Sequence, residues 1–98
     1  MLHLLSLTVL SPEIVERIGA RDDVVLQQGL VWAALKGHAD NAKLLSLLAK
    51  QCQVCVLQEM LAVNGIENSA VLAGVKIIDY PGLVELTVKN SAIHTWCS

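Results

Sequence analysis

Residues 78–90 have the sequence IDYPGLVELTVKN, which reads as the end of a buried strand, a sharp turn and a short helix. Proline is well tolerated in the first turn of a helix, and an aspartate just before that turn suits the N-cap position. We therefore expect Asp79 to cap a helix that begins at Pro81. The stretch contains no nucleophile, so we expect it to build the fold and to take no direct part in chemistry.

On the N-terminal side of this stretch, apolar runs of strand length alternate with segments of helical period. This alternation is typical of parallel strands joined by right-handed crossovers, with helices on both faces of the sheet. The sequence predicts an α/β fold in which residues 1–98 form a single three-layer domain of about five mostly parallel strands flanked by helices, as in flavodoxin-like proteins. The expected strands are 2–9, 24–26, 54–57, 75–78 and 92–97, and the expected helices are 12–20, 30–35, one beginning near residue 40, 59–65 and 81–90.

The chain has an excess of apolar residues for a small domain. They make up 54% of the sequence, whereas charged residues make up 16%, against roughly 25% in an average soluble domain. The segment 30–35 is apolar on every side, so a helix there must be covered on every side. Two explanations stay open, a well-filled core and a surface covered by partner subunits. The candidate interface residues are Leu30, Val31, Trp32, Leu35 and Trp96.

The charge pattern argues against nucleic-acid binding by this chain alone. The net charge is −2, and the basic residues are scattered without forming a positive stripe. The apolar opening lacks the cationic start of a secretory signal, and no apolar run approaches the roughly 18 residues of a membrane span. We therefore expect a cytoplasmic protein, in which cysteines remain thiols.

The helix that begins near residue 40 is expected to be amphipathic. Four leucines are predicted to face inward, while Lys43 and Lys50 share the side that faces water. The simplest interpretation of both lysines is a solvated face. The inward set is Leu44, Leu45, Leu47 and Leu48.

Polar residues gather where the predicted strands end. Ligand sites of doubly wound sheets lie beyond these carboxyl ends, so a shallow site is one interpretation. The alternative, which we favour, is that these side chains cap the helices that follow. Glu59 and Asp79 would act as an acid and a base only if they lay close together. The whole set is Thr8, Gln27, Gln28, Gly29, Gln58, Glu59, Asp79 and Tyr80.

Cys52 and Cys55 have the spacing of a redox dithiol or of half a zinc site. A redox pair of this spacing works from the first turn of a helix, whereas this one opens a predicted strand. Residues three apart on a strand point to opposite faces of the sheet, so the two sulfurs are too poorly directed to bond or to share a metal. We expect both to be buried as small apolar residues.

Cys97 lies near the end of the sequence, where a side chain is more readily exposed. It is the best persulfide candidate, although only His94 is a candidate base or cation nearby in the sequence. The glycines stand singly, so no phosphate cradle is expected, and the three histidines have no paired spacing for a metal. We therefore expect no cofactor, no metal and no catalytic residue.

Short motifs along nearly the whole chain make it similar to the DsrH/TusB family of sulfur-relay subunits. They are Leu2-His3, Leu26-Gln27-Gln28-Gly29, residues 78–90 and Trp96. The resemblance implies a small parallel α/β fold that assembles with DsrE/TusD-like and DsrF/TusC-like homologues into a heterohexamer. In the Tus version this complex passes persulfide sulfur toward 2-thiolation of the tRNA wobble uridine, and in the Dsr version it serves sulfur oxidation.

The family places its main persulfide cysteine on the DsrE/TusD-type subunit, and some DsrH-type members carry another in the first helix. Residues 12–20 of this chain contain none, and Gln28 stands where relatives often have aspartate. The resemblance therefore implies a non-catalytic subunit of a sulfur-relay complex. Two alternatives stay open: an active persulfide carrier that uses Cys97 or Cys55, and a flavodoxin-like module that binds a small molecule.

Overall fold

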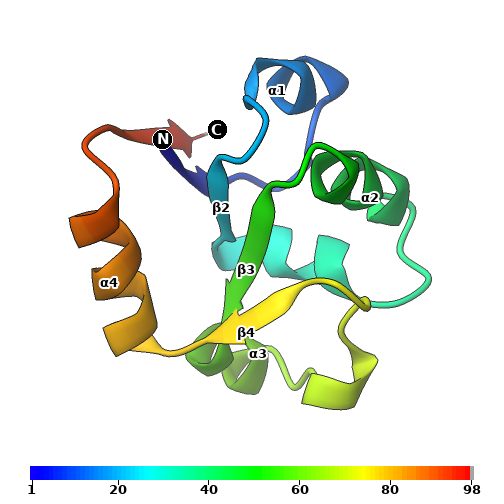
Figure 1. The fold of residues 1–98 in the computed structure, drawn as a ribbon. Coiled ribbons are helices and arrows are strands. Elements are labelled where there is room, and N and C mark those ends of the chain that lie inside the picture. Colours follow the sequence, from blue (N-terminus) through cyan, green and yellow to red (C-terminus); the bar gives the residue numbers. More distant parts are fainter. Residues whose placement is uncertain (98) are drawn as a thin grey trace.

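The computed structural model describes residues 1–97, which form a five-stranded parallel sheet with helices on both faces (Figure 1). The strand order is β4-β3-β2-β1-β5, and every pair of neighbours is parallel. The prediction of an α/β fold with about five parallel strands is confirmed. The elements are β1 (Leu2–Ser6), α1 (Pro12–Arg17), β2 (Asp23–Leu26), the 3-10 helix η1 (Gln28–Ala34), α2 (Asn41–Ala49), β3 (Gln53–Leu57), α3 (Gln58–Val63), the 3-10 helix η2 (Asn68–Ala70), β4 (Lys76–Ile78), α4 (Tyr80–Lys89) and β5 (Ile93–Cys97).

The first strand is shorter than the apolar run from Leu2 to Val9 predicted. β1 ends at Ser6, which pairs with Cys97 at the end of β5, while β2 ends one pair earlier. Within the described residues neither β2 nor β5 pairs with the chain beyond Ser6, so it bends away although it is still apolar. The extent of a strand thus depends on its neighbours as well as on its own residues.

Helix starts follow the predicted capping chemistry. The Ser11 hydroxyl accepts a hydrogen bond from the Ile14 N–H at 3.4 Å, and Pro12 opens α1. At the other end of the chain the Asp79 carboxylate accepts the Gly82 N–H at 2.8 Å at the start of α4. Each cap satisfies a backbone donor that has no partner inside its helix. The predicted role of Asp79 is confirmed.

Two hydrophobic clusters form the core, one on each face of the sheet. The larger cluster joins inward residues of the central strands to α1, η1 and α2, for example Val24 and Val54 to Leu44 and Leu47. The smaller one lies under α4, whose Leu86 joins strand residues on the opposite face. In Figure 1, α1 and α2 lie on one side of the strands and α4 lies alone on the other.

Three details of the predicted packing are wrong. Leu45 is 51% exposed, because α2 turns only part of its leucine-rich surface toward the sheet. Lys43 and Lys50 are only partly exposed, and their ammonium groups bind backbone carbonyls instead of lying on a free solvated face. Leu30 and Val31 are at most 1% exposed, so the chain's own core already covers them and they are not available to a partner.

Candidate functional site

The carboxyl end of the sheet holds a shallow cavity of about 210 Å³. Its polar atoms come from Gln27 and Gln28 after β2 and from Tyr80 at the start of α4. The other lining residues, Leu57, Met60 and Leu83, are apolar. The Gln27 Oε1 accepts a hydrogen bond from the Ser6 hydroxyl at 2.8 Å, which fixes one amide at the rim. The sheet therefore brings together three of the residues predicted for this edge: Gln27, Gln28 and Tyr80.

Other members of the predicted polar set are used differently. Asp79 is occupied by the α4 cap, and Gln28 has a positive φ of 53°, a conformation that L residues other than Asn and Asp seldom adopt. The Glu59 Oε2 atom is buried without a hydrogen-bond partner among residues 1–97. The polar contacts that the cavity offers come from the two amides and the Tyr80 phenol.

The pair Cys52 and Cys55 is divided between the two faces of the sheet, as the strand spacing predicts. Cys52 belongs to the larger core cluster and Cys55 to the smaller one. The Cys52 thiol donates a hydrogen bond to the Gly19 carbonyl at 3.2 Å, and burial raises its pKa. Burial also raises the pKa of Cys55, to about 11, and its side chain is 0% exposed. Neither sulfur is a thiolate at neutral pH, which is the form that sulfur chemistry needs.

Cys97 is the exposed cysteine, at the end of β5. Its neighbour in the sheet is Ser6, and no hydrogen bond to its sulfur occurs within residues 1–97. In this part of the chain no group of three or more His, Cys, Asp or Glu residues is arranged to hold a metal. Cys97 therefore has the access that a persulfide carrier requires, and within the described residues it has no hydrogen bond that would activate its sulfur.

His3 belongs to a buried hydrogen-bond network that the sequence did not predict. His3 is 2% exposed, and its Nε2 lies 2.8 Å from the Asp22 Oδ2. The Trp96 indole N–H donates to the His3 Nδ1 at 3.1 Å, so the hydrogen on the ring belongs on Nε2 and is donated to the carboxylate. The position of His3 between leucines in β1 is a signal that this histidine is buried, but it does not indicate its partners.

Asp22 collects several donors at the amino end of the sheet. Burial alone would raise its pKa, but hydrogen bonds from His3, from the Gly19 N–H and from the amino terminus together hold the pKa below 3.8. Through His3 this carboxylate is connected to Trp96, which is half-buried against the larger cluster. Trp96 thus stabilises the attachment of β5 to β1.

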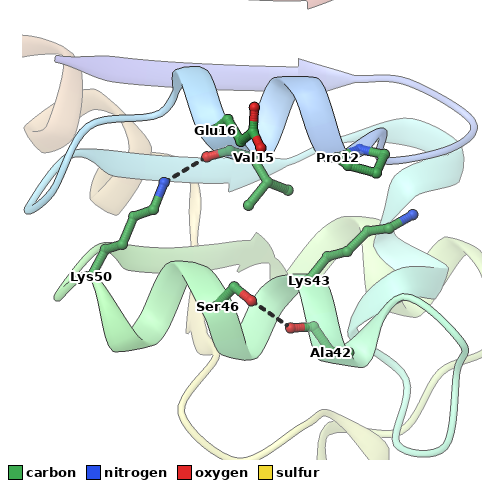
Figure 2. A pocket seen from close by; sticks show the side chains of 7 residues that line it. All are labelled: Pro12, Val15, Glu16, Ala42, Lys43, Ser46 and Lys50. Atoms are coloured by element: carbon green, nitrogen blue, oxygen red, sulfur yellow. Dashed lines mark hydrogen bonds between the residues drawn. The ribbon is translucent and has the colours of Figure 1, made fainter.

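A groove of about 390 Å³ lies between α1 and α2 (Figure 2). Small side chains, Ala42 and Ser46, line the α2 side. The Lys50 Nζ reaches across and donates to the Val15 and Ile18 carbonyls at 2.7 and 3.0 Å. Lys43 donates to the Leu10 carbonyl and pairs with Asp40. Lys50 therefore joins α2 to α1, and Lys43 joins α2 to the segment before α1, so both ammonium groups are occupied within the chain.

Of the candidate interface residues that remain, Trp32 has the most free surface. It is 41% exposed on η1, although its neighbours in that helix are buried. Leu35 is half-buried, packs against the larger cluster and forms an isolated antiparallel bridge with Val71. None of the described helices is long and apolar enough to cross a membrane.

The sheet order and the helices on both of its faces define a small parallel α/β protein. The family model described as "DsrH like protein" matches residues 9–93. The chain belongs to the DsrH-like family, so the predicted resemblance is confirmed at the level of the family.

Two solved structures have the same fold. The ychN protein from E. coli is 15% identical, with a TM-score of 0.77 and 97% of each chain covered. MTH1491 from Methanobacterium thermoautotrophicum, described as a protein of unknown function, is 14% identical, with a TM-score of 0.73 and 97% of this chain and 96% of that chain covered. No curated protein sequence matches the chain significantly.

Proposed function

We propose that this chain is a non-catalytic subunit of a sulfur-relay complex, in which homologous DsrE/TusD-like and DsrF/TusC-like subunits complete a heterohexamer. The observation that carries the proposal is the state of the thiols in a member of the DsrH-like family. Cys52 and Cys55 are buried and protonated, and Cys97 has no activating contact within residues 1–97. The sulfur would travel on a partner's cysteine, in the cytoplasm.

In the pathway that we propose, the complex passes persulfide sulfur toward 2-thiolation of the tRNA wobble uridine. The scattered basic residues support a role without direct contact to the RNA. The alternative within the same family is a complex for sulfur oxidation. Assaying the assembled complex with each acceptor separates the two, because only the tRNA pathway produces a thiolated nucleoside.

The test of the subunit role is co-purification with a cysteine-bearing homologue, followed by transfer from a persulfide donor. We expect a stable complex, and we expect Cys97→Ser to transfer sulfur at the wild-type rate, whereas a serine at the partner's cysteine abolishes transfer. A chain that stays alone at micromolar concentration in the presence of its homologues would contradict the proposal.

The exposure of Cys97 favours a second candidate function, that of an active persulfide carrier. In that role the Cys97 thiolate attacks the outer sulfur of a donor persulfide, and the donor leaves as a thiolate. Mass spectrometry after incubation with the donor distinguishes the two roles. A stable increment of one sulfur on Cys97, with loss of transfer in Cys97→Ser, would replace the first proposal by this one.

A further inference from the structure

The two edges of the sheet differ in how well they are protected against pairing with another strand. β4 forms one edge and has only three residues, of which the first, Lys76, is exposed and charged. β5 forms the other edge with the five residues Ile93–Cys97, which contain no charge and no proline. Native sheets usually protect an edge by short length, lysine, proline or a bulge. β4 has two of these features and β5 has none of them.

The register of β5 shows which backbone groups face outward. The Leu2 N–H donates to the Ala92 carbonyl at 3.0 Å, and Leu2 pairs with Ile93. Hydrogen-bonding groups alternate in direction along a strand, so residues 92, 94 and 96 face β1. The N–H and C=O groups of Ile93, Thr95 and Cys97 therefore face the free edge, and the side chains of these residues are exposed.

We propose that β5 is an interface between two copies of this chain, which pair antiparallel about a two-fold axis at Thr95. In this register Thr95 faces Thr95 of the other copy, Ile93 faces Cys97, and His94 faces Trp96. Every outward N–H and C=O of β5 then has a partner, since the outward residues pair only with one another. The two sheets become one continuous sheet.

The side chains of β5 favour a second copy as the occupant. A strand that pairs with itself about its centre must not place like charges opposite one another. β5 contains no Asp, Glu, Lys or Arg, and its one histidine would face a tryptophan. Threonine pairs and aromatic pairs are both favourable cross-strand neighbours. His94 and Trp96 already pack with ring centroids 4.3 Å apart, so two such pairs would form one aromatic cluster. The pairing is independent of the proposed role in sulfur transfer.

Thr95→Pro tests the pairing at its centre. The Thr95 N–H makes no bond to β1, so proline leaves the sheet of one chain intact and removes the central intermolecular donor. Thr95→Val keeps this N–H and is the matched control. Light scattering on a concentration series of the purified chain should give twice the mass of one chain for the wild type and Thr95→Val, and the mass of one chain for Thr95→Pro. Far-UV circular dichroism should be the same for all three.

A cross-link tests the register. Residues opposite one another in an antiparallel pair have Cα atoms within the range of a disulfide, whereas Ile93 and Cys97 lie too far apart within one strand. Ile93→Cys oxidised with glutathione disulfide should give a covalent dimer through Cys97, and the same substitution combined with Cys97→Ser should not. A wild-type chain that keeps the mass of one chain throughout the concentration series, or a Thr95→Pro variant that remains dimeric, would overturn the proposal. So would a wild-type chain that is monomeric alone while Thr95→Pro loses binding to a homologous subunit.

Discussion

The two faces of the sheet differ in how completely the chain covers them. On the first face α1, η1 and α2 enclose the larger core cluster, whereas on the second face α4 lies alone over a smaller one (Figure 1). On α4, Val84 and Val88 are 58% and 81% exposed. The apolar excess of the sequence is therefore divided unevenly: the first face buries more of it in a larger core, although Trp32 and Leu45 remain exposed there, and the second face has the smaller core and the two exposed valines of α4.

The same comparison separates the cysteines. Cys52 lies in the larger cluster on the first face. Cys55 and the exposed Cys97 have their side chains on the second face, and Cys97 is in register with Ser6 on β1. Cys55 lies beneath α4, and Cys97 lies on the edge strand. A single face thus carries both a deeply buried thiol and a free one, and the difference between them measures how much of that face α4 protects.

Alkylation of the native chain should show the largest difference. Cys97 should react with iodoacetamide as a free thiol, whereas Cys55 should react only when the structure opens, which slows it by about a thousandfold or more. Mass spectrometry of peptides over a time course measures both rates, and the same chain in urea provides the control in which the rates converge. Similar rates in the native chain would mean that α4 does not protect the second face.

Core truncations compare the two clusters directly. Leu47→Ala removes a side chain that is 0% exposed in the larger cluster and should lower the free energy of unfolding by about 3 to 5 kcal/mol. Leu86→Ala acts in the smaller cluster at an 8% exposed position and should cost about 2 kcal/mol. Leu45→Ala, at a 51% exposed position on the same helix as Leu47, is the control and should cost no more than about 0.5 kcal/mol. Urea denaturation checks all three, and equal losses for Leu47 and Leu86 would remove the distinction between the faces.

The hydrogen-bond network of Asp22 and His3 should contribute less to the stability of the fold in acid. The pKa of Asp22 is lowered in the folded chain, so its carboxylate stabilises the fold above the unfolded value of 3.8, and this contribution is lost as the pH falls through the lower folded value. Asp22→Asn should reduce the free energy of unfolding by about 1 to 2 kcal/mol at neutral pH. Because the wild type loses this contribution in acid, the two proteins should approach one another in stability below pH 3.8. A difference that stays constant down to that range would mean that the charge of Asp22 is not what stabilises the network.

Much of the fold was predictable because its signals are local. Strand-length apolar runs, the caps at Ser11 and Asp79 and the opposite directions of Cys52 and Cys55 all follow from residues close together in the sequence. The predictions that were wrong depend on contacts across the chain. Lys50 binds carbonyls of α1, and β1 stops where its neighbouring strands stop, so neither outcome is encoded within its own segment.

The candidate site was less predictable for the same reason. Three polar residues of the carboxyl edge do meet at one cavity, since parallel strands end on the same side of a sheet. The link from Trp96 through His3 to Asp22 joins residues from both ends of the chain, and no spacing rule predicts it. Likewise Leu30 and Trp32 are close in an apolar segment, yet one is buried and the other is 41% exposed, because η1 is covered on most sides by the chain itself.

A substitution on the outer side of α4 should change the free energy of unfolding least, and it tests whether that side is free in the isolated chain. Valine and serine have similar helix propensities, so Val88→Ser at an 81% exposed position should change the free energy of unfolding by less than about 0.5 kcal/mol. Leu86→Ser changes a buried residue two positions earlier on the same helix. Thermal and urea unfolding of both variants measure the difference in stability between the buried and the exposed side of α4. A loss of more than about 1 kcal/mol in Val88→Ser would mean that the isolated chain already covers this side of α4 by self-association, because the described residues 1–97 leave this side chain exposed. That contact would be separate from pairing through β5, since Thr95→Pro would not reproduce its effect on stability.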